Sequence, residues 1–200
     1  MYSPFESGIT YHGDSANDPM IENFSYVGEP ISIETMKPMW RITKGNMRLK
    51  SNCPSGGFAE INETMRVVWS GKAYYKTCIS VSFTKKDMKM INDYEGFHIM
   101  FRYQNSDNLY VASIRNDQRI VVKKKVNGIY KTLFEVGFVH VVNEIINASL
   151  QIDEGYLDLV VNGVCCTVDF PGNELPYGSI GFRGDNLTAE IHKVSAGILK

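Results

Sequence analysis

The 200-residue sequence predicts an all-β protein, built as a two-sheet antiparallel β-sandwich without long helices. Many short segments alternate apolar and polar residues at near-regular spacing, which is typical of two packed sheets. The pairs Asn127-Gly128 and Asn162-Gly163 each separate two such segments. An Asn-Gly pair in this position indicates a type I′ hairpin turn, because both central residues need a positive φ.

The elements follow in order along the chain. Residues 1–30 are rich in Gly, Ser, Asp, Asn and Pro, so we expect an irregular lead-in packed on the domain, with room for one short strand. Residues 31–200 are expected to form a single sandwich domain. Its strands are expected near residues 31–35, 39–43, 46–50, 57–61, 65–69, 73–83, 96–104, 108–115, 119–126, 129–136, 147–153, 156–161, 164–169, 178–183 and 187–195. Segments 85–93 and 137–146 interrupt this series, and neither has the apolar spacing and caps of a helix.

Alternation also predicts which side of a strand is buried. The odd positions from Phe97 to Tyr103 are apolar or aromatic and are expected to face the core. His98, Met100 and Arg102 should then share the opposite face. The even positions between 148 and 152 are expected to face the core in the same way.

Four cysteines in 200 residues, without a C-x-x-C pair, fit a reduced protein better than a disulfide framework. Cys165 and Cys166 are neighbours on an expected strand, so their side chains should point to opposite faces. We therefore expect one of them in the core and the other outside it.

The composition limits the classes of partner. Hydrophobic residues make up 44% and aromatic residues 12% of the chain, which supplies a core and argues against disorder. The 21 basic and 22 acidic residues give a net charge of -1, so electrostatics favour neither nucleic acid nor an anionic membrane. The run Lys123-Lys124-Lys125 is interpreted as a solvated strand or hairpin edge.

Targeting signals are weak. No apolar stretch approaches the roughly 18 residues of a membrane-spanning helix, and residues 1–6 lack the features of a signal peptide. The sequence as written thus predicts a soluble protein, either cytoplasmic or an excised module of an exported protein.

Strong catalytic and cofactor motifs for nucleotides, zinc or a serine nucleophile are absent from the sequence. Asp14 and Asp18 in one polar loop could bind a Ca²⁺ ion together with backbone carbonyls, the alternative being a plain solvated loop. His98, Arg102 and Tyr110 form the best catalytic constellation, because they could meet on one face if their two strands pair.

A series of strand-like motifs runs in one order along most of the chain. They are Trp40-Arg41-Ile42, Gly45-Asn46-Met47-Arg48-Leu49, Gly56-Gly57-Phe58-Ala59-Glu60-Ile61, Tyr74-Tyr75, residues 96–103, residues 108–114, Val161-Asn162-Gly163 and residues 178–183. This order resembles the concanavalin A-like lectin/glucanase jelly rolls, in their laminin-G-like and keto-disaccharide-hydrolase-like branches. The resemblance covers nearly all of residues 31–195.

The resemblance implies a jelly-roll sandwich with one concave face. In many relatives that face binds oligosaccharide, and a Ca²⁺ ion often lies at one rim, so no cofactor is certain here and a structural Ca²⁺ ion is possible. The chain departs from the hydrolase members because no E-x-D-x-x-E is present. It departs from the alginate-lyase-like members because their Q-[IV]-H and Y-x-K-A-G strands are absent. Both departures count against catalysis, and the fold alone does not supply a function.

The leading hypothesis is a noncatalytic carbohydrate-binding module for an oligo- or polysaccharide. Aromatic rings would stack on sugar faces while polar side chains reach the hydroxyls. The predicted ligand-binding residues, on the face opposite the core, are Arg102, Tyr110 and His98, with Arg183 and Trp69 nearby. Each has a structural alternative: core packing for Trp69 and Tyr110, edge ion pairs for the arginines, and an outward polar position for His98.

Two other classes of function stay open for this chain, an enzyme and a protein-interaction domain. A glycoside hydrolase or polysaccharide lyase would bring two acids, or His98 with Arg102 and a tyrosine, into a deep groove. A laminin-G-like interaction domain, with a protein partner or a second copy of the chain, would show an apolar patch at the loop rim.

Overall fold

The computed structural model describes residues 77–153, 155–169, 174–176 and 178–198 and, before residue 77, six short strands. Side chains are described between residues 79 and 192. The expected strand near 31–35 lies outside the described residues. The described residues contain no helix, and segments 86–95 and 138–144 are irregular. Within that described part, no helix of the length and apolarity needed to cross a membrane is found.

The strands form two sheets. The nine-stranded sheet has the order β1 (Thr10–Tyr11), β4 (Met47–Leu49), β5 (Ala59–Ile61), β16 (Ala189–Ile198), β7 (Thr77–Lys85), β12 (Ile145–Ile152), β13 (Tyr156–Val161) and β14 (Val164–Asp169), with β2 (Ser25–Val27) paired to β16. The seven-stranded sheet has the order β11 (Ile129–Gly137), β10 (Arg119–Val126), β9 (Asn108–Arg115), β8 (Gly96–Asn105), β15 (Ser179–Asp185), β6 (Met65–Trp69) and β3 (Trp40–Lys44). All pairings are antiparallel except that of β2 with β16.

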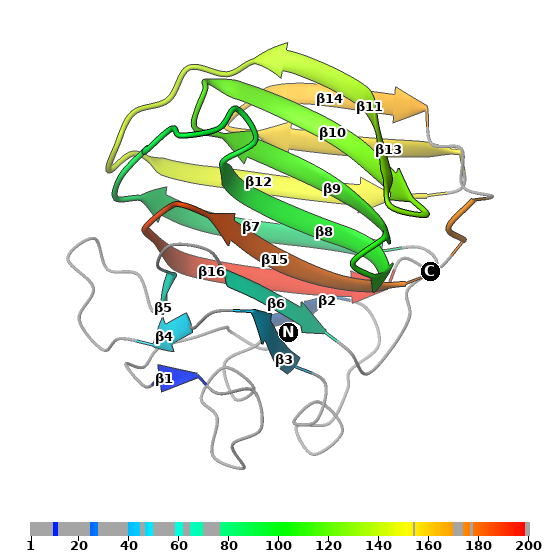
Figure 1. Cartoon of the computed structure of the whole chain (residues 1–200), viewed down its shortest axis with the longest axis horizontal. Helices are drawn as coiled ribbons and strands as arrows, with labels where there is room; N and C mark the ends of the chain where they lie inside the picture. Colours follow the sequence, from blue (N-terminus) through cyan, green and yellow to red (C-terminus); the bar gives the residue numbers. More distant parts are fainter. Residues whose placement is uncertain are drawn as a thin grey trace.

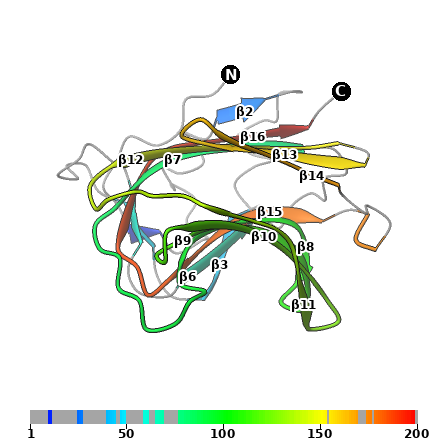
Figure 2. The ribbon, with the colours of Figure 1, turned by 90° about the horizontal axis from the view of Figure 1, so that it is seen from above.

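The two sheets pack face to face as a β-sandwich, which confirms the predicted fold class. Seen from above, β7, β12 and β13 form one layer and β8, β9, β10 and β15 form the other (Figure 2). In the front view, β8 to β11 lie before β12 and β13 (Figure 1).

Two Asn-Gly turns close hairpins, as predicted. Asn127 and Gly128 have φ values of 50° and 82°, and Asn162 and Gly163 have φ values of 44° and 86°. These turns join β10 to β11 and β13 to β14. The positive φ values are those that a type I′ turn requires.

Replacing Gly163 by alanine is expected to lower the free energy of unfolding by about 1 kcal/mol, because its φ of 86° disfavours a side chain. A Cβ atom at this position would meet no atom within 4 Å, so the cost should be conformational alone. Urea unfolding of the unmodified chain and of Gly163→Ala measures this difference in the free energy of unfolding. A loss above roughly 3 kcal/mol would contradict a purely local effect.

The core lies between the two layers. The ring of Phe83 on β7 stacks on the ring of Phe97 on β8, with centroids 4.0 Å apart, and so joins the two sheets. On β12, residues alternate strictly between exposed and buried, with the even positions inside, as predicted. Cys166 is buried and Cys165 is exposed, so this pair also divides between the faces as predicted.

The expected alternation fails at one place on β8. Phe97, Ile99 and Phe101 face the core as predicted, but Arg102 has a φ of 46° and the pairing with β9 shifts between Phe101 and Asn105. This irregularity changes the direction of the following side chains. Tyr103 consequently packs against Met100, Leu109 and Val111 rather than in the main core, so its predicted position is wrong.

Candidate functional site

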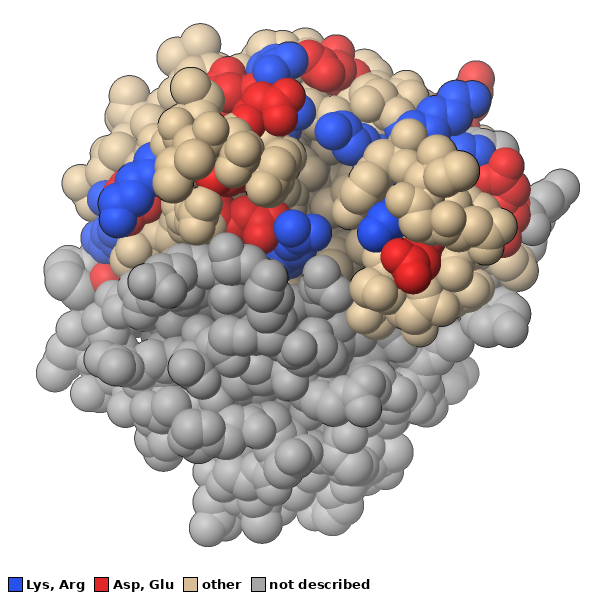
Figure 3. All heavy atoms as spheres, viewed as in Figure 1, with Lys and Arg blue, Asp and Glu red and all other residues tan. Residues whose placement is uncertain are grey.

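A groove of about 320 Å³ opens on the outer face of the seven-stranded sheet. It lies over β8, β9, β10, β11 and β15, and the irregular segment 86–95, here called the wall loop, borders it. Figure 3 shows this hollow on the described face, with basic and acidic atoms around it. The lining residues are Asp93, Tyr94, His98, Met100, Leu109, Val111, Ser113, Arg115, Lys123, Tyr130, Arg183 and Asp185.

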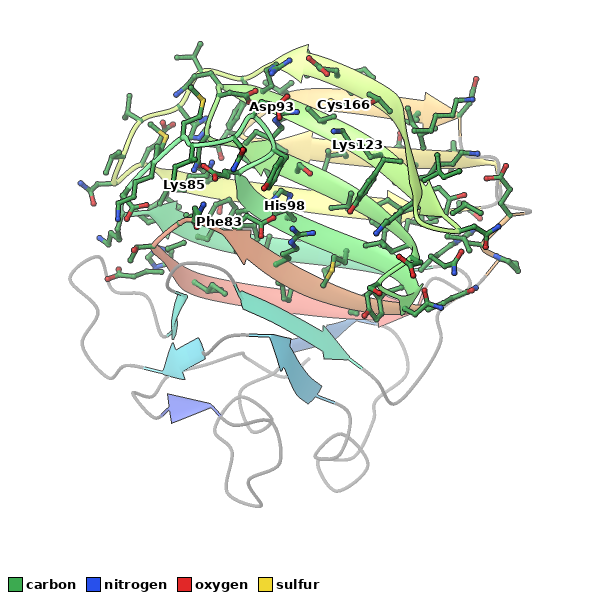
Figure 4. The ribbon with its side chains drawn as sticks, in the orientation of Figure 1. Phe83, Lys85, Asp93, His98, Lys123 and Cys166 are labelled. Carbon is green, nitrogen blue, oxygen red and sulfur yellow. The ribbon has the colours of Figure 1, made fainter. Side chains whose placement is uncertain are left out.

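A polar network forms one part of the groove floor. His98 Nδ1 lies 2.8 Å from Ser113 Oγ, and His98 Nε2 lies 3.3 Å from Asp185 Oδ2. Arg183 contacts the same carboxylate oxygen at 2.6 Å. The sheet register brings these residues together, because His98 is opposite Ser113 on one side and opposite Arg183 on the other. Figure 4 shows His98 on β8.

Burial fixes the charges in this network. Burial lowers the pKa of His98, and the carboxylate of Asp185 opposes this only in part, so the imidazole is neutral at pH 7. Burial would raise the pKa of Asp185, but the contacts with His98 and Arg183 outweigh it and hold that pKa below its usual range. Asp185 is therefore an ionised acceptor.

Two polar atoms of the network are buried and lack a well-aligned hydrogen bond among the described residues, namely His98 Nε2 and Asp185 Oδ2. They face each other at 3.3 Å, and Arg183 contacts the same oxygen at 2.6 Å. The network therefore closes the groove floor from beneath, and its outer members present their charge to the groove.

The residue types Ser113, His98 and Asp185 are also those of a serine-hydrolase triad. The surroundings of the serine differ from a triad site. Ser113 lies inside β9 and is paired with His98 on one side and with Val121 on the other. The sheet ladders thus use the backbone N–H groups that would form an oxyanion hole.

Apolar and aromatic groups form the rest of the groove. Met100, Leu109 and Val111 are buried beneath it as a small separate cluster. Tyr94 and Tyr130 are 49% and 47% exposed, so each ring presents surface to a ligand. The groove thus combines an apolar floor and two exposed rings with charged side chains, which suits a polar organic ligand.

Hydrogen bonds hold the wall loop against the sheet. The carboxylate of Glu95 accepts from the backbone N–H of Ile91 at 2.7 Å and from the side chains of Asn92 and Asn186. Burial would raise the pKa of Glu95, but these hydrogen bonds outweigh it and lower that pKa. Arg115 contacts Asp93 of the loop at 3.3 Å. Tyr94 is thus carried by a segment that is fixed on both sides.

A buried lysine anchors the start of the wall loop. Lys85 Nζ donates to Ile114 O at 2.8 Å, to Asn116 Oδ1 at 3.1 Å and to His140 Nε2 at 3.0 Å. Burial lowers the pKa of the Lys85 amine to about 7, and the charge of Asp117 opposes this only in part. The position of Lys85 beside the wall loop is visible in Figure 4.

The groove contains two of the five predicted ligand-binding residues, His98 and Arg183. Tyr110 is fully buried in the core and stacks on Phe101, so its predicted place on the opposite face is wrong. The reason is register: Tyr110 pairs with Phe101 and therefore shares its core-facing side.

Arg102 is 2% exposed and donates to the carbonyl of Leu175 at 3.0 Å, outside the groove lining. The predicted constellation of His98, Arg102 and Tyr110 is therefore wrong as a shared site. Trp69 ends β6, but its side chain lies outside the described residues.

The predicted Ca²⁺ ligands Asp14 and Asp18 lie outside the described residues, so a Ca²⁺ site stays a prediction. In the part of the chain where side chains are described, no group of three or more His, Cys, Asp or Glu residues could hold a metal ion.

Sequence reasoning missed Tyr94, Ser113, Lys123, Tyr130 and Asp185 as groove residues. Ser113 carried a usable signal, because pairing the two predicted strands around residues 105–108 places it near His98. Asp185 follows the predicted end of a strand at 183, and Tyr94 lies in a segment without periodicity. Neither offered a pattern that points to the groove.

A second hollow, of about 420 Å³, lies over β7, β12 and β13 of the nine-stranded sheet. Its lining is made of small or amide side chains and contains no aromatic or charged residue. Although this hollow is larger, it offers no ring for stacking and no charge for recognition. The groove is therefore the better candidate site.

No family model and no curated protein sequence matches this chain. Solved structures do match it. The carbohydrate binding module CBM66 from Bacillus subtilis superposes with a TM-score of 0.63 at 15% identity, over 78% of this chain and 94% of that one. The winged bean acidic lectin, complexed with methyl-α-D-galactose, gives a TM-score of 0.58 at 13% identity, over 79% and 91%. The chain thus shares the β-sandwich fold of these two proteins.

An enzyme-like protein shares this fold as well. A candidate glycosyl hydrolase from Parabacteroides distasonis superposes with a TM-score of 0.52 at 10% identity, over 71% of this chain and 80% of that one. At these identities the similarity establishes the fold and does not carry a ligand or a reaction from one protein to another.

Proposed function

We propose that the protein is a noncatalytic carbohydrate-binding module whose ligand, an oligo- or polysaccharide, lies in the groove of the seven-stranded sheet. The observation that carries this proposal is that two exposed tyrosines border a groove lined with charged side chains. Tyr94 and Tyr130 are 49% and 47% exposed, and Lys123, Arg183 and Asp93 line the same groove. A sugar ring has an apolar C–H face for the rings and hydroxyls for the polar side chains.

The acids in the groove favour binding over hydrolysis. A glycoside hydrolase needs one carboxylic acid with a raised pKa and a second carboxylate across the bond. The groove has two carboxylates, Asp93 and Asp185. Arg115 contacts the first and Arg183 the second, and the pKa of Asp185 is held below its usual range by its contacts. Asp185 is therefore unsuited to the role of the protonated acid.

Replacing Tyr130 by alanine is expected to weaken saccharide binding about tenfold, because one stacking ring is lost. A glycan-array screen with and without Ca²⁺, followed by calorimetric titration of the best ligand, measures this loss. The control is Tyr156→Ala, because Tyr156 is 37% exposed and lies on β13 of the other sheet.

Equal losses in both tyrosine variants would place the ligand outside the groove. A folded protein that binds nothing on the array would reject a carbohydrate-binding function. Release of reducing sugar from a bound polysaccharide, absent in His98→Ala, would instead support the glycoside hydrolase or lyase alternative.

One observation favours a second candidate, a protein-interaction domain. The connection between β11 and β12 and the first residue of β12 expose several apolar side chains: Val139 is 85%, Val141 60% and Ile145 50% exposed. Exposed apolar side chains that lie close together mark interaction surfaces in many proteins. Sedimentation of the chain and of a Val139→Ser/Val141→Ser variant tests for self-association, which would be reduced in the variant.

A further inference from the structure

The three consecutive lysines on β10 do not have equivalent environments. Lys124 pairs with Glu174, and Lys125 contacts Asp107 at 3.2 Å and lies over the Tyr130 ring, 5.1 Å from its centroid. Lys123 is half-buried and lines the groove. It has no hydrogen bond or ion pair with any described residue. The basic run, interpreted from sequence as a solvated edge, therefore places inside the candidate site one cation that has no partner among the described residues.

Every other cation of the groove has an anionic partner. Arg115 lies 2.6 Å from Asp117 and 3.3 Å from Asp93, and Arg183 lies 2.6 Å from Asp185. In a half-buried position an unpaired ammonium is less well solvated than in water, so an anion from a ligand would gain by meeting it.

The sum of the charges in the groove also favours an anionic ligand. Its lining contains three cationic side chains and two carboxylates, and His98 adds no charge at pH 7 because its pKa is lowered. One positive charge is thus in excess, although the whole chain has a net charge of -1. Figure 4 shows Lys123 on β10 and His98 on β8, both over the same sheet.

We propose that the ligand of the groove is an acidic saccharide, whose carboxylate or sulfate group pairs with Lys123 while its ring lies between Tyr94 and Tyr130. This inference rests on the proposed function and specifies its ligand class. A lysine suits either anion, because its ammonium acts as a compact point charge without the fork geometry that a bidentate arginine imposes.

The remaining lining explains why the anion belongs to a sugar. A small inorganic anion would pair with Lys123 but leave the exposed rings of Tyr94 and Tyr130 in contact with water. An acidic sugar matches both parts at once, with its anion on Lys123 and its C–H groups on the rings.

Matched pairs of ligands test the proposal. Oligogalacturonate is compared with its methyl ester, and dextran sulfate with dextran, so that within each pair chiefly the anion changes. These two pairs separate carboxylate from sulfate, and an array of acidic and neutral glycans finds the best backbone. Affinities are measured for the unmodified chain, for Lys123→Gln and for Lys131→Gln.

Lys131→Gln is the matched control. Lys131 is exposed on β11 and pairs in register with Lys124, so it lies on the other face of the sheet from Lys123. The Lys131→Gln substitution removes one positive charge from the chain, as Lys123→Gln does. Polyglutamate serves as a polyanion without sugar rings.

The expected result is that the acidic member of one pair binds better than the neutral member and that Lys123→Gln weakens this binding about tenfold. Lys131→Gln should change the affinities for the acidic and the neutral ligand by no more than about twofold. Added salt should weaken the binding of the acidic ligand but not that of the neutral one.

Neutral glycans that bind as well as acidic ones, or an acidic ligand unaffected by Lys123→Gln, would overturn the proposal and leave the carbohydrate-binding function standing. Equal binding of polyglutamate would overturn it in favour of nonspecific charge attraction. A folded protein that binds no glycan, acidic or neutral, would overturn both the proposal and the proposed function.

Discussion

Replacing Gly96 by alanine is expected to lower the free energy of unfolding by about 3 kcal/mol and the melting temperature by roughly 10 °C. Gly96 begins β8 and is paired with Arg115 of β9 and with Asp185 of β15. A Cβ atom at this position would lie 2.4 Å from Ile114 O and 2.8 Å from Arg115 Cα. Both are backbone atoms of a central strand, so neither can turn away as a side chain would.

Differential scanning calorimetry of the two proteins measures this effect. The control is Gly137→Ala at the end of β11, where an added Cβ would meet no atom within 4 Å. This control should melt within about 2 °C of the unmodified chain. Equal melting temperatures for Gly96→Ala and the unmodified chain would show that β8 and β9 do not approach each other as closely as described.

The stability of the protein is expected to rise between pH 7 and pH 9, by about 2 kcal/mol. Burial lowers the pKa of Lys85 to about 7 in the folded chain, whereas an unfolded lysine keeps its value of 10.5. Between these values the unfolded chain holds a proton that the folded chain has released. Raising the pH therefore favours the folded state across this window.

Urea titrations at pH 7, 8 and 9 measure how the free energy of unfolding changes with pH. In Lys85→Met this increase should be absent. Above this range other groups act in the opposite direction, because burial raises the pKa values of Cys166 and Tyr110 in the folded chain. A pH-independent stability would indicate that the hydrogen bonds from Lys85 to Ile114, Asn116 and His140 keep its amine charged despite burial.

The sequence predicted the architecture well because local chemistry decides it. Asn127-Gly128 and Asn162-Gly163 require the turn geometry that is found, and alternation in β12 and in the first half of β8 places the correct side chains inside. The pattern failed at Arg102, where a positive φ interrupts the strand. An irregularity of this kind depends on the neighbouring strands, and the alternation of residues in β8 does not reveal it.

The candidate site was predictable only in part, for a related reason. Alternation placed His98 on the correct face of β8, and Arg183, predicted to lie nearby, pairs with it in register on β15. Tyr110 was misplaced because its side is set by pairing with Phe101, which depends on the register between two strands. Tyr94 and Asp93 reach the groove through a segment held by Glu95 and Asn186, and such long-range hydrogen bonds have no local sequence pattern.

The two tyrosines that border the groove belong to structurally separate units. Tyr94 is carried by the wall loop, and Tyr130 by β11 next to the Asn127-Gly128 turn, with the strands of the sheet between them. Neither tyrosine takes part in the Phe83–Phe97 contact that joins the layers. The distance between the rings could thus be altered by exchanging either segment as a cassette, which makes this scaffold suitable for selecting variants that accept broader or narrower ligands.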